Sequence, residues 1–150
     1  QSARVWWLLP CVVICFIMAD SWIIQWNMHI DLPDSAFETW AKANEAQLAE
    51  VTKLLTSFHS VGYFVLCFVV IALVAGITEE FLFRGLLQNV FQRGFQNVHG
   101  AIWLSAILFS AFHLQFYGFV PRLLLGALFG YLYAWSRNLW VPIAAHAINN

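Results

Sequence analysis

The stretch VGYFVLCFVVIALVAGITEEFLFRGLLQ, residues 61–88, decides the fold of this chain. It opens with an uninterrupted apolar run over residues 61–76 and then places Glu79 and Glu80 side by side. An acidic side chain at the centre of a membrane helix costs about 2.5–3.5 kcal/mol on insertion scales, so an adjacent pair requires partners. The chain offers three basic side chains in similarly apolar surroundings: Arg84, His113 and His146.

The composition places the chain in a membrane. Of its 150 residues 61% are hydrophobic and 10% are charged, and the mean hydropathy is +0.71. Soluble domains are about 45–50% apolar and about 25% charged. The net charge of −1 and the absence of a basic cluster in the sequence argue against a nucleic-acid partner. Three cysteines lie in apolar runs without metal-ligand spacing, and we expect them to be free thiols: Cys11, Cys15 and Cys67.

The apolar pattern predicts an all-α, polytopic transmembrane bundle that forms a single membrane domain over residues 1–150. We expect about five membrane segments: Val5–Ile24, Ser57–Gln92, Ala101–Phe116, Pro121–Trp135 and a last one from Leu139 onward. The last segment reaches only about 18 Å of helix, whereas a bilayer core is about 30 Å thick. We therefore expect a fragment that is truncated at its C-terminus.

A polar connection over residues 27–56 separates the first two segments. It includes Asp31 and Asp34, and its second half, residues 36–55, places apolar side chains near helical spacing. Such a pattern predicts an amphipathic helix that lies on the membrane surface. Short loops rich in arginine tend to be cytoplasmic. On that basis we expect the side carrying Arg4, Arg93 and Arg137 to face the cytoplasm.

The glutamate pair divides into two environments. Glu80 and Arg84 are four residues apart, with the acid first, which is the favourable order for an ion pair on a helix. Glu79 points about 100° away from Glu80 around the helix axis. Glu79 is therefore left without the arginine and is free to act as a general base.

Two further pairs have the same four-residue spacing. Residue 96 lies midway between Glu79 and His113, so two antiparallel helices joined there bring these side chains to the same depth. Phe109 lies one turn before His113 and packs on its face. His146 and Asn150 share a face of the last segment and supply hydrogen-bond donors or a metal ligand.

In their order along the chain, these residues form the motifs EExxxR, FxxxH and HxxxN. The combination resembles the CPBP intramembrane protease family, also known as Abi or CAAX prenyl protease 2-like proteins. The resemblance is carried by about residues 75–150, and we take residues 57–150 as the catalytic core. It implies a helical membrane bundle with a cavity open to the cytoplasmic side of the cell membrane.

The resemblance also implies roles for the motif residues. Glu79 and His113 activate a water molecule, and His146 and Asn150 stabilise the oxyanion. Supporting positions are filled by Glu80, Arg84 and Phe109. No cofactor is required by the sequence; a zinc ion held by Glu79, His113 and His146 is the metal-dependent alternative. The expected substrates are membrane-associated peptides or proteins, either prenylated or of the bacteriocin type.

Two other classes of function remain open from the residues themselves. The same glutamates and histidines could form the proton relay of a small ion- or proton-coupled transporter, although no inverted repeat is visible in the sequence. A non-catalytic membrane scaffold of the bacteriocin-immunity type is the third alternative. Hydrolysis by the purified protein distinguishes the protease from both.

Overall fold

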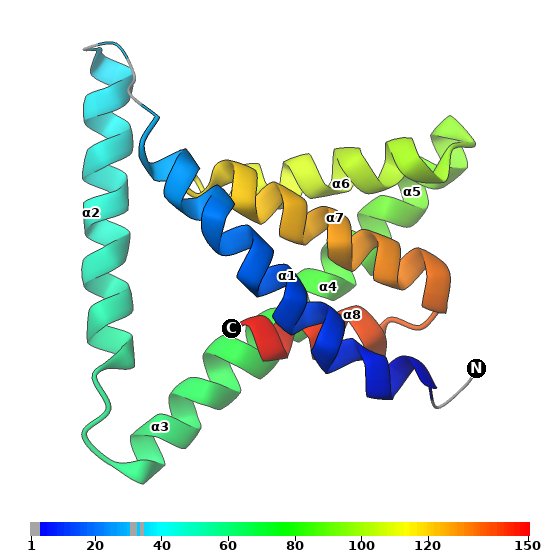
Figure 1. The fold of residues 1–150 in the computed structure, drawn as a ribbon, viewed down its shortest axis with the longest axis horizontal. Coiled ribbons are helices and arrows are strands. Elements are labelled where there is room, and N and C mark those ends of the chain that lie inside the picture. The colour runs from blue at the N-terminus through cyan, green and yellow to red at the C-terminus, as the bar shows by residue number, and fades with distance from the viewer. Residues whose placement is uncertain (1–3, 31–32, 34) are drawn as a thin grey trace.

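The chain folds into helices in the computed structural model, which describes residues 4–30, 33 and 35–150. No strand occurs in that part of the chain, so the predicted all-α class is confirmed. A continuous helical stretch from Val61 to Phe95 follows two N-terminal helices and precedes three C-terminal ones, and the first helix lies against the last two (Figure 1). The other helices are α1 (Arg4–Met28), α2 (Ala36–Thr56), α6 (Val98–Phe112), α7 (Phe119–Ser136) and α8 (Trp140–Asn149).

The helical stretch that carries the glutamate pair alternates between α- and π-geometry. Its parts are α3 (Val61–Cys67), η1 (Phe68–Val74), α4 (Ala75–Glu80), η2 (Phe81–Leu87) and α5 (Gln88–Phe95). The short helix α4, which ends with both glutamates, therefore lies between two π-helical segments. π-Helical turns are rare and are found frequently at functional sites. The sequence carried no recognisable signal for this change of helical geometry.

Two helices are long and apolar enough to cross a membrane, Val5–Met28 and Val61–Phe95. The apolar helix Val98–Phe112 is shorter than this length. These three helices correspond to the first three predicted membrane segments. The expected total of five membrane segments remains a prediction.

The connection between α5 and α6 is tighter than predicted. Only Gln96 and Asn97 separate the two helices, where a turn over residues 94–100 was expected. Gln96 adopts a left-handed conformation with φ 54°, and the Asn97 side chain accepts hydrogen bonds from the first amides of α6. An N-cap of this kind satisfies donors that the helix itself leaves unpaired, which explains why α6 begins at Val98.

The predicted helix over residues 101–116 also ends earlier than expected. α6 stops at Phe112, so His113 is its C-terminal cap and residues 113–118 form the connection to α7. Leu114 has φ 56°, a left-handed conformation that costs a non-glycine residue about 1–2 kcal/mol. The chain therefore turns sharply immediately after the candidate histidine.

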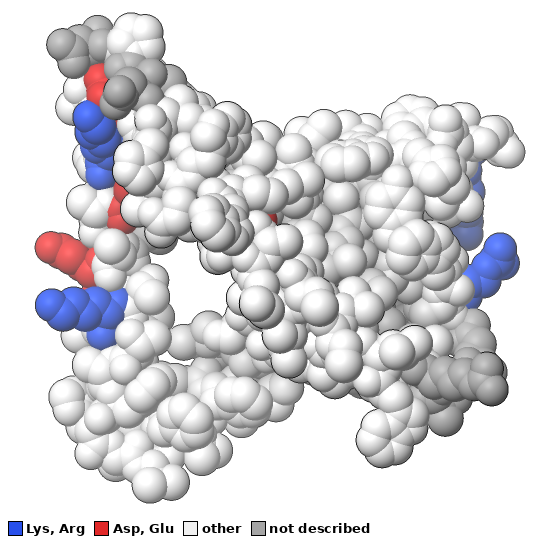
Figure 2. All heavy atoms as spheres, in the orientation of Figure 1, with Lys and Arg blue, Asp and Glu red and all other residues white. Residues whose placement is uncertain are grey.

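Helix α2 stands apart from the other helices (Figure 1). The Ser35 side chain caps it by accepting a hydrogen bond from the Glu38 amide at 3.2 Å, three residues into the helix. Figure 2 shows acidic and basic side chains gathered along α2, and an opening between this helix and the rest of the molecule. The predicted helix over residues 36–55 is confirmed, whereas its position on the membrane surface stays a prediction. Asp31, Asp34 and the side chain of Arg4 lie outside the described part of the chain.

The C-terminal helices pack around two core clusters. Leu9 and Val13 of α1 meet Phe129 of α7 and the apolar face of α8, and Ile102 and Ala106 of α6 meet Ala127 of α7. The contact between α6 and α7 depends on two glycines spaced as in GxxxG, Gly126 and Gly130. A Cβ atom at Gly126 would lie 3.2 Å from the Ala106 Cα, so the helices approach there more closely than a side chain permits.

Candidate active site

Glu80 and Arg84 form a fully buried ion pair at the centre of the bundle. The Arg84 Nη1 donates to the Glu80 Oε1 at 2.7 Å, and the two side chains are 1% and 0% exposed. The Arg84 Nη2 donates to the backbone carbonyl of Gly126 at 2.7 Å. The predicted pair is present, and it also ties the glutamate helix to α7.

Two aromatic rings enclose the arginine. The guanidinium carbon of Arg84 lies 4.6 Å from the centre of the Phe109 ring and 5.4 Å from that of Phe129. Such contacts stabilise a cation where water is absent. The predicted packing of Phe109 against His113 is also present, with ring centres 5.0 Å apart. Phe109 therefore contacts both the ion pair and the candidate histidine.

His146 reaches the same ion pair from α8. Its Nδ1 lies 2.8 Å from the Glu80 Oε1, and its ring stacks on Phe129. A Cβ atom at Gly76 would lie 3.7 Å from the Cβ of His146, which is an ordinary van der Waals contact, so α8 packs directly against α4 at this position.

The hydrogen-bond partners of the two histidines indicate their tautomers. The His113 Nδ1 lies 2.7 Å from the Phe109 carbonyl, which can only accept, so Nδ1 carries the proton. The His146 Nδ1 faces the carboxylate of Glu80 and is likewise the donor. In a neutral imidazole the other nitrogen is then an acceptor, so each histidine presents an Nε2 lone pair.

Both lone pairs face Glu79. The Glu79 Oε2 lies 3.8 Å from the Nε2 of His113 and 3.8 Å from that of His146. This oxygen is buried and has no hydrogen-bond partner. Three acceptors converge at distances too long for direct hydrogen bonds, and a bridging water molecule, which has two O–H donors, is the usual way in which such acceptors are satisfied.

A pocket of ≈ 300 Å³ opens onto Glu79 and His113. Apolar side chains form its walls, Leu82, Phe83 and Phe112. The side chains of Glu79 and His113 are each 31% exposed, whereas that of His146 is 5% exposed. The first two residues thus lie at the mouth of the site, and His146 lies behind them with the ion pair.

Asn150 lies apart from this group. Its Nδ2 donates to the backbone carbonyl of Ile71 in η1 at 3.2 Å, and its backbone amide bonds to His146. The structure therefore brings together Glu79, His113 and His146, while the Asn150 amide contacts the π-helical segment. The role of Asn150 as an oxyanion donor stays a prediction.

The connection that follows His113 is held by residues that carried no sequence motif. Asn44 of α2 donates to the Leu114 carbonyl at 2.5 Å. Glu45 accepts from the Gln115 side chain at 3.3 Å and from the Tyr117 amide at 3.2 Å. Arg122 donates to Gln115 from the other side. Helix α2 thus positions the segment that carries the candidate histidine.

A catalytic zinc ion would need three protein ligands and one position open to water or substrate. Two neutral imidazoles and a carboxylate are zinc ligands by type, and the Nδ1 partners of the histidines are those that zinc-bound histidines commonly have. Among the described residues, however, no group of three or more histidine, cysteine, aspartate or glutamate side chains is arranged to hold a metal ion. The chemistry proposed below therefore uses the side chains and a water molecule.

Comparison with known families places this geometry in context. Residues 61–150 match the Rce1-like family, described as type II CAAX prenyl endopeptidase Rce1-like. The chain belongs to this family. The Rce1-like chain is also 25% identical to the uncharacterized protein YpbD of Bacillus subtilis (strain 168), over 99% of its own length and 66% of that protein's length. No solved structure is significantly similar to it.

Family membership confirms the resemblance drawn from the three motifs. The family's description names an endopeptidase activity, and it is said of the family. The roles of individual residues are not part of that finding.

Proposed function

We propose that this Rce1-like chain is an intramembrane endopeptidase that hydrolyses a peptide bond with a water molecule held between Glu79 and the two histidines. One observation supports the proposal most strongly. The Glu79 Oε2 is a buried acceptor without a partner, and two imidazole Nε2 atoms lie 3.8 Å from it. A carboxylate next to a bound water is the arrangement that general-base catalysis requires.

The proposed reaction has three steps. Glu79 takes a proton from the water while the water oxygen attacks the carbonyl carbon of the substrate, and His113 orients the water through its Nε2. For this step His146 takes up a proton at Nε2 and exchanges its lone pair for a donor. The imidazolium, which Glu80 stabilises at Nδ1, then donates from Nε2 to the developing oxyanion. Glu79 then returns the proton to the leaving amine as the C–N bond breaks.

The pocket favours an apolar stretch of substrate next to the scissile bond. Leu82, Phe83 and Phe112 line it beside Glu79 and His113, and apolar contacts of this kind supply affinity while a few polar groups fix orientation. Prenylated proteins and bacteriocin-type peptides both meet this requirement. A cleavage assay should therefore include farnesylated and unmodified peptides of the same sequence.

Two expectations about the side of the membrane that the cavity faces disagree with each other. The family resemblance implies a cavity open to the cytoplasm, whereas the arginine distribution implies that the end carrying Arg93 and Arg137 is cytoplasmic. α6 runs from that end to His113 over about 22 Å, and therefore separates the arginines from the pocket. We propose that the cavity opens to the cytoplasm, and labelling single cysteines introduced at Phe112 and Arg137 with a membrane-impermeant reagent tests this orientation.

The decisive experiment is hydrolysis by the purified full-length protein in nanodiscs, with synthetic peptides followed by mass spectrometry. Glu79→Gln keeps the size of the side chain and removes the base, so we expect no detectable cleavage. His113→Ala should also be inactive. Glu50→Gln, at an exposed position on α2, is the matched control and should cleave at the normal rate.

Each outcome separates the candidate functions. Full activity of Glu79→Gln refutes the proposed mechanism. Absence of cleavage by the unmodified protein together with proton-coupled flux in liposomes identifies a transporter. Absence of both leaves the non-catalytic scaffold.

A further inference from the structure

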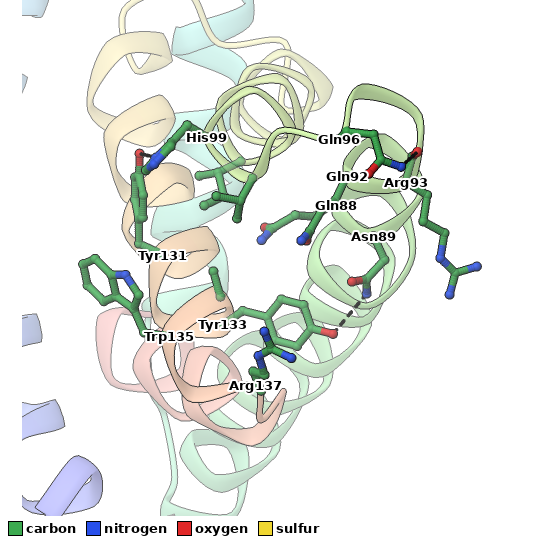
Figure 3. Close-up of a pocket in the computed structure, with 13 residues that line it drawn as sticks. Gln88, Asn89, Gln92, Arg93, Gln96, His99, Tyr131, Tyr133, Trp135 and Arg137 are labelled. Atoms are coloured by element: carbon green, nitrogen blue, oxygen red, sulfur yellow. Dashed lines mark hydrogen bonds between the residues drawn. The ribbon is translucent and has the colours of Figure 1, made fainter.

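A second and larger pocket lies at the end of the bundle where α5 ends and α6 begins. Its volume is ≈ 740 Å³, and Glu79 and His113 are not among its lining residues. Figure 3 shows the residues from α5, from α6 and from the end of α7 that line it, with Arg93 and Trp135 at its outer edges. Its polar lining includes Gln88, Gln92, Arg93, Tyr133 and Arg137.

The pocket carries positive charge without a counter-charge. Arg93 and Arg137 line it, no carboxylate does, and neither arginine belongs to an ion pair of the described residues. The only acidic residues after Leu54 are Glu79 and Glu80 of the candidate active site. Figure 2 shows basic and no acidic atoms on the viewed face at the end of the molecule opposite α2. An anion is the ligand that this charge favours.

The inner part of the pocket presents an unused acceptor. Gln88 is 1% exposed and donates through its Nε2 to the Gly130 carbonyl at 3.1 Å. Its Oε1 is buried without a partner. A buried acceptor of this kind is costly unless a donor reaches it. Because this oxygen is closed to solvent, a ligand hydroxyl reaches it only when the Gln88 side chain turns toward the pocket.

Tyr133 adds a donor on the wall of the pocket. Its hydroxyl oxygen accepts from the Asn89 side chain at 3.0 Å, as the dashed line in Figure 3 shows. The hydroxyl proton therefore remains available for an anionic oxygen. Gln92 lines the same pocket with an amide group.

The surrounding aromatic residues place the pocket at the level of lipid head groups. Trp135 is 74% exposed, Trp140 is 62% exposed and Phe95 is 53% exposed, all near this end of the bundle. Exposed tryptophans collect where the hydrocarbon core meets the head groups. Basic pockets between membrane helices bind anionic head groups by charge. In the orientation proposed above, this pocket faces the leaflet opposite the cytoplasm.

We propose that this pocket binds the head group of an anionic glycerophospholipid. Arg93 and Arg137 contact the phosphodiester, Tyr133 donates to it, and a head-group hydroxyl donates to the Oε1 of Gln88. Phosphatidylglycerol has both features, a single negative phosphodiester and free hydroxyl groups. The site is separate from the proposed hydrolysis and does not depend on it.

Native mass spectrometry of the full-length protein, released from detergent with added lipid, tests the proposal. We expect one retained phosphatidylglycerol per chain and no comparable retention of phosphatidylcholine. Each arginine near an anionic head group contributes about a fivefold change in affinity, so Arg93→Gln/Arg137→Gln should weaken retention roughly 30-fold. Lys53→Gln, which removes a positive charge from α2, is the matched control and should retain the lipid normally.

A second variant separates the pocket from general charge attraction. Tyr133→Phe keeps both arginines, so it should weaken retention only if the lipid occupies the pocket. A thermal melt in lipid-free detergent shows whether each variant is folded. Equal retention of the two lipids, unchanged retention by the double variant, or equally tight binding of free glycerol 3-phosphate would each overturn the assignment.

Discussion

Replacing Arg84 with methionine tests how the buried ion pair supports the site. Arg84 donates to Glu80 and to the Gly126 carbonyl, both at 2.7 Å, and stacks near two aromatic rings. Methionine keeps an unbranched apolar stem of similar length and removes every polar contact. The variant therefore measures what happens when Glu80 loses its counter-charge and the two rings lose their contact with the guanidinium.

The largest contribution to the loss comes from Glu80 itself. Breaking a buried pair by removing one partner costs about 3–5 kcal/mol, because an uncompensated charge remains. The hydrogen bond to Gly126 contributes about 0.6 kcal/mol, the average for polar contacts between membrane helices. We therefore expect Arg84→Met to lower the free energy of unfolding by about 3–5 kcal/mol.

A double variant separates the charge from the contact. In Glu80→Gln/Arg84→Met both charges are gone, and replacing a buried pair by neutral groups is often close to neutral for stability. We expect the double variant to recover most of the stability lost by the single variant. It should nevertheless hydrolyse slowly, because a glutamine stabilises a protonated His146 less than a carboxylate does.

The assay combines reversible unfolding in mixed micelles with peptide cleavage for wild type and the two variants. Arg84→Lys, which keeps the charge and loses the planar fork, should lie between wild type and Arg84→Met. Wild-type stability of Arg84→Met would refute the reasoning, since it would mean that Glu80 needs no arginine. A double variant less stable than Arg84→Met would refute it as well.

Three further predictions address the helix packing, the oxyanion donor and the metal. Gly130→Ala should lower the free energy of unfolding by about 1–3 kcal/mol, because the new Cβ would lie 2.8 Å from the Ile102 Cγ2. Gly62→Ala is the control in the same unfolding assay, since nothing lies within 4 Å of a Cβ atom there. Asn150→Ala should lower kcat about 10²–10³-fold, because one oxyanion donor is lost. A loss below tenfold in the cleavage assay would show that Asn150 is not an oxyanion donor and that its role is the contact with Ile71. Treatment with a chelator, checked by elemental analysis, should leave hydrolysis unchanged; loss of activity that returns with added zinc would contradict the metal-free mechanism.

The spacing of residues along the sequence was sufficient to predict the helices and two side-chain contacts. Four-residue spacing on a helix fixes which side chains are neighbours, so the pair Glu80–Arg84 and the packing of Phe109 on His113 were predictable from position alone. The similar distance of Glu79 and His113 from the turn near residue 96 predicted their approach. The ends of α6 were predicted less well, because they depend on the Asn97 cap and on the left-handed Leu114.

Only the tertiary structure decided how the rest of the site is assembled. The bond from His146 to Glu80 joins residues 66 positions apart, and it depends on the packing of α8 against α4. Residues 44 and 45 of α2 carried no motif, yet they hold the connection after His113. Sequence spacing determines contacts within a helix, whereas contacts between helices depend on which surfaces pack, and that is settled by the whole chain at once.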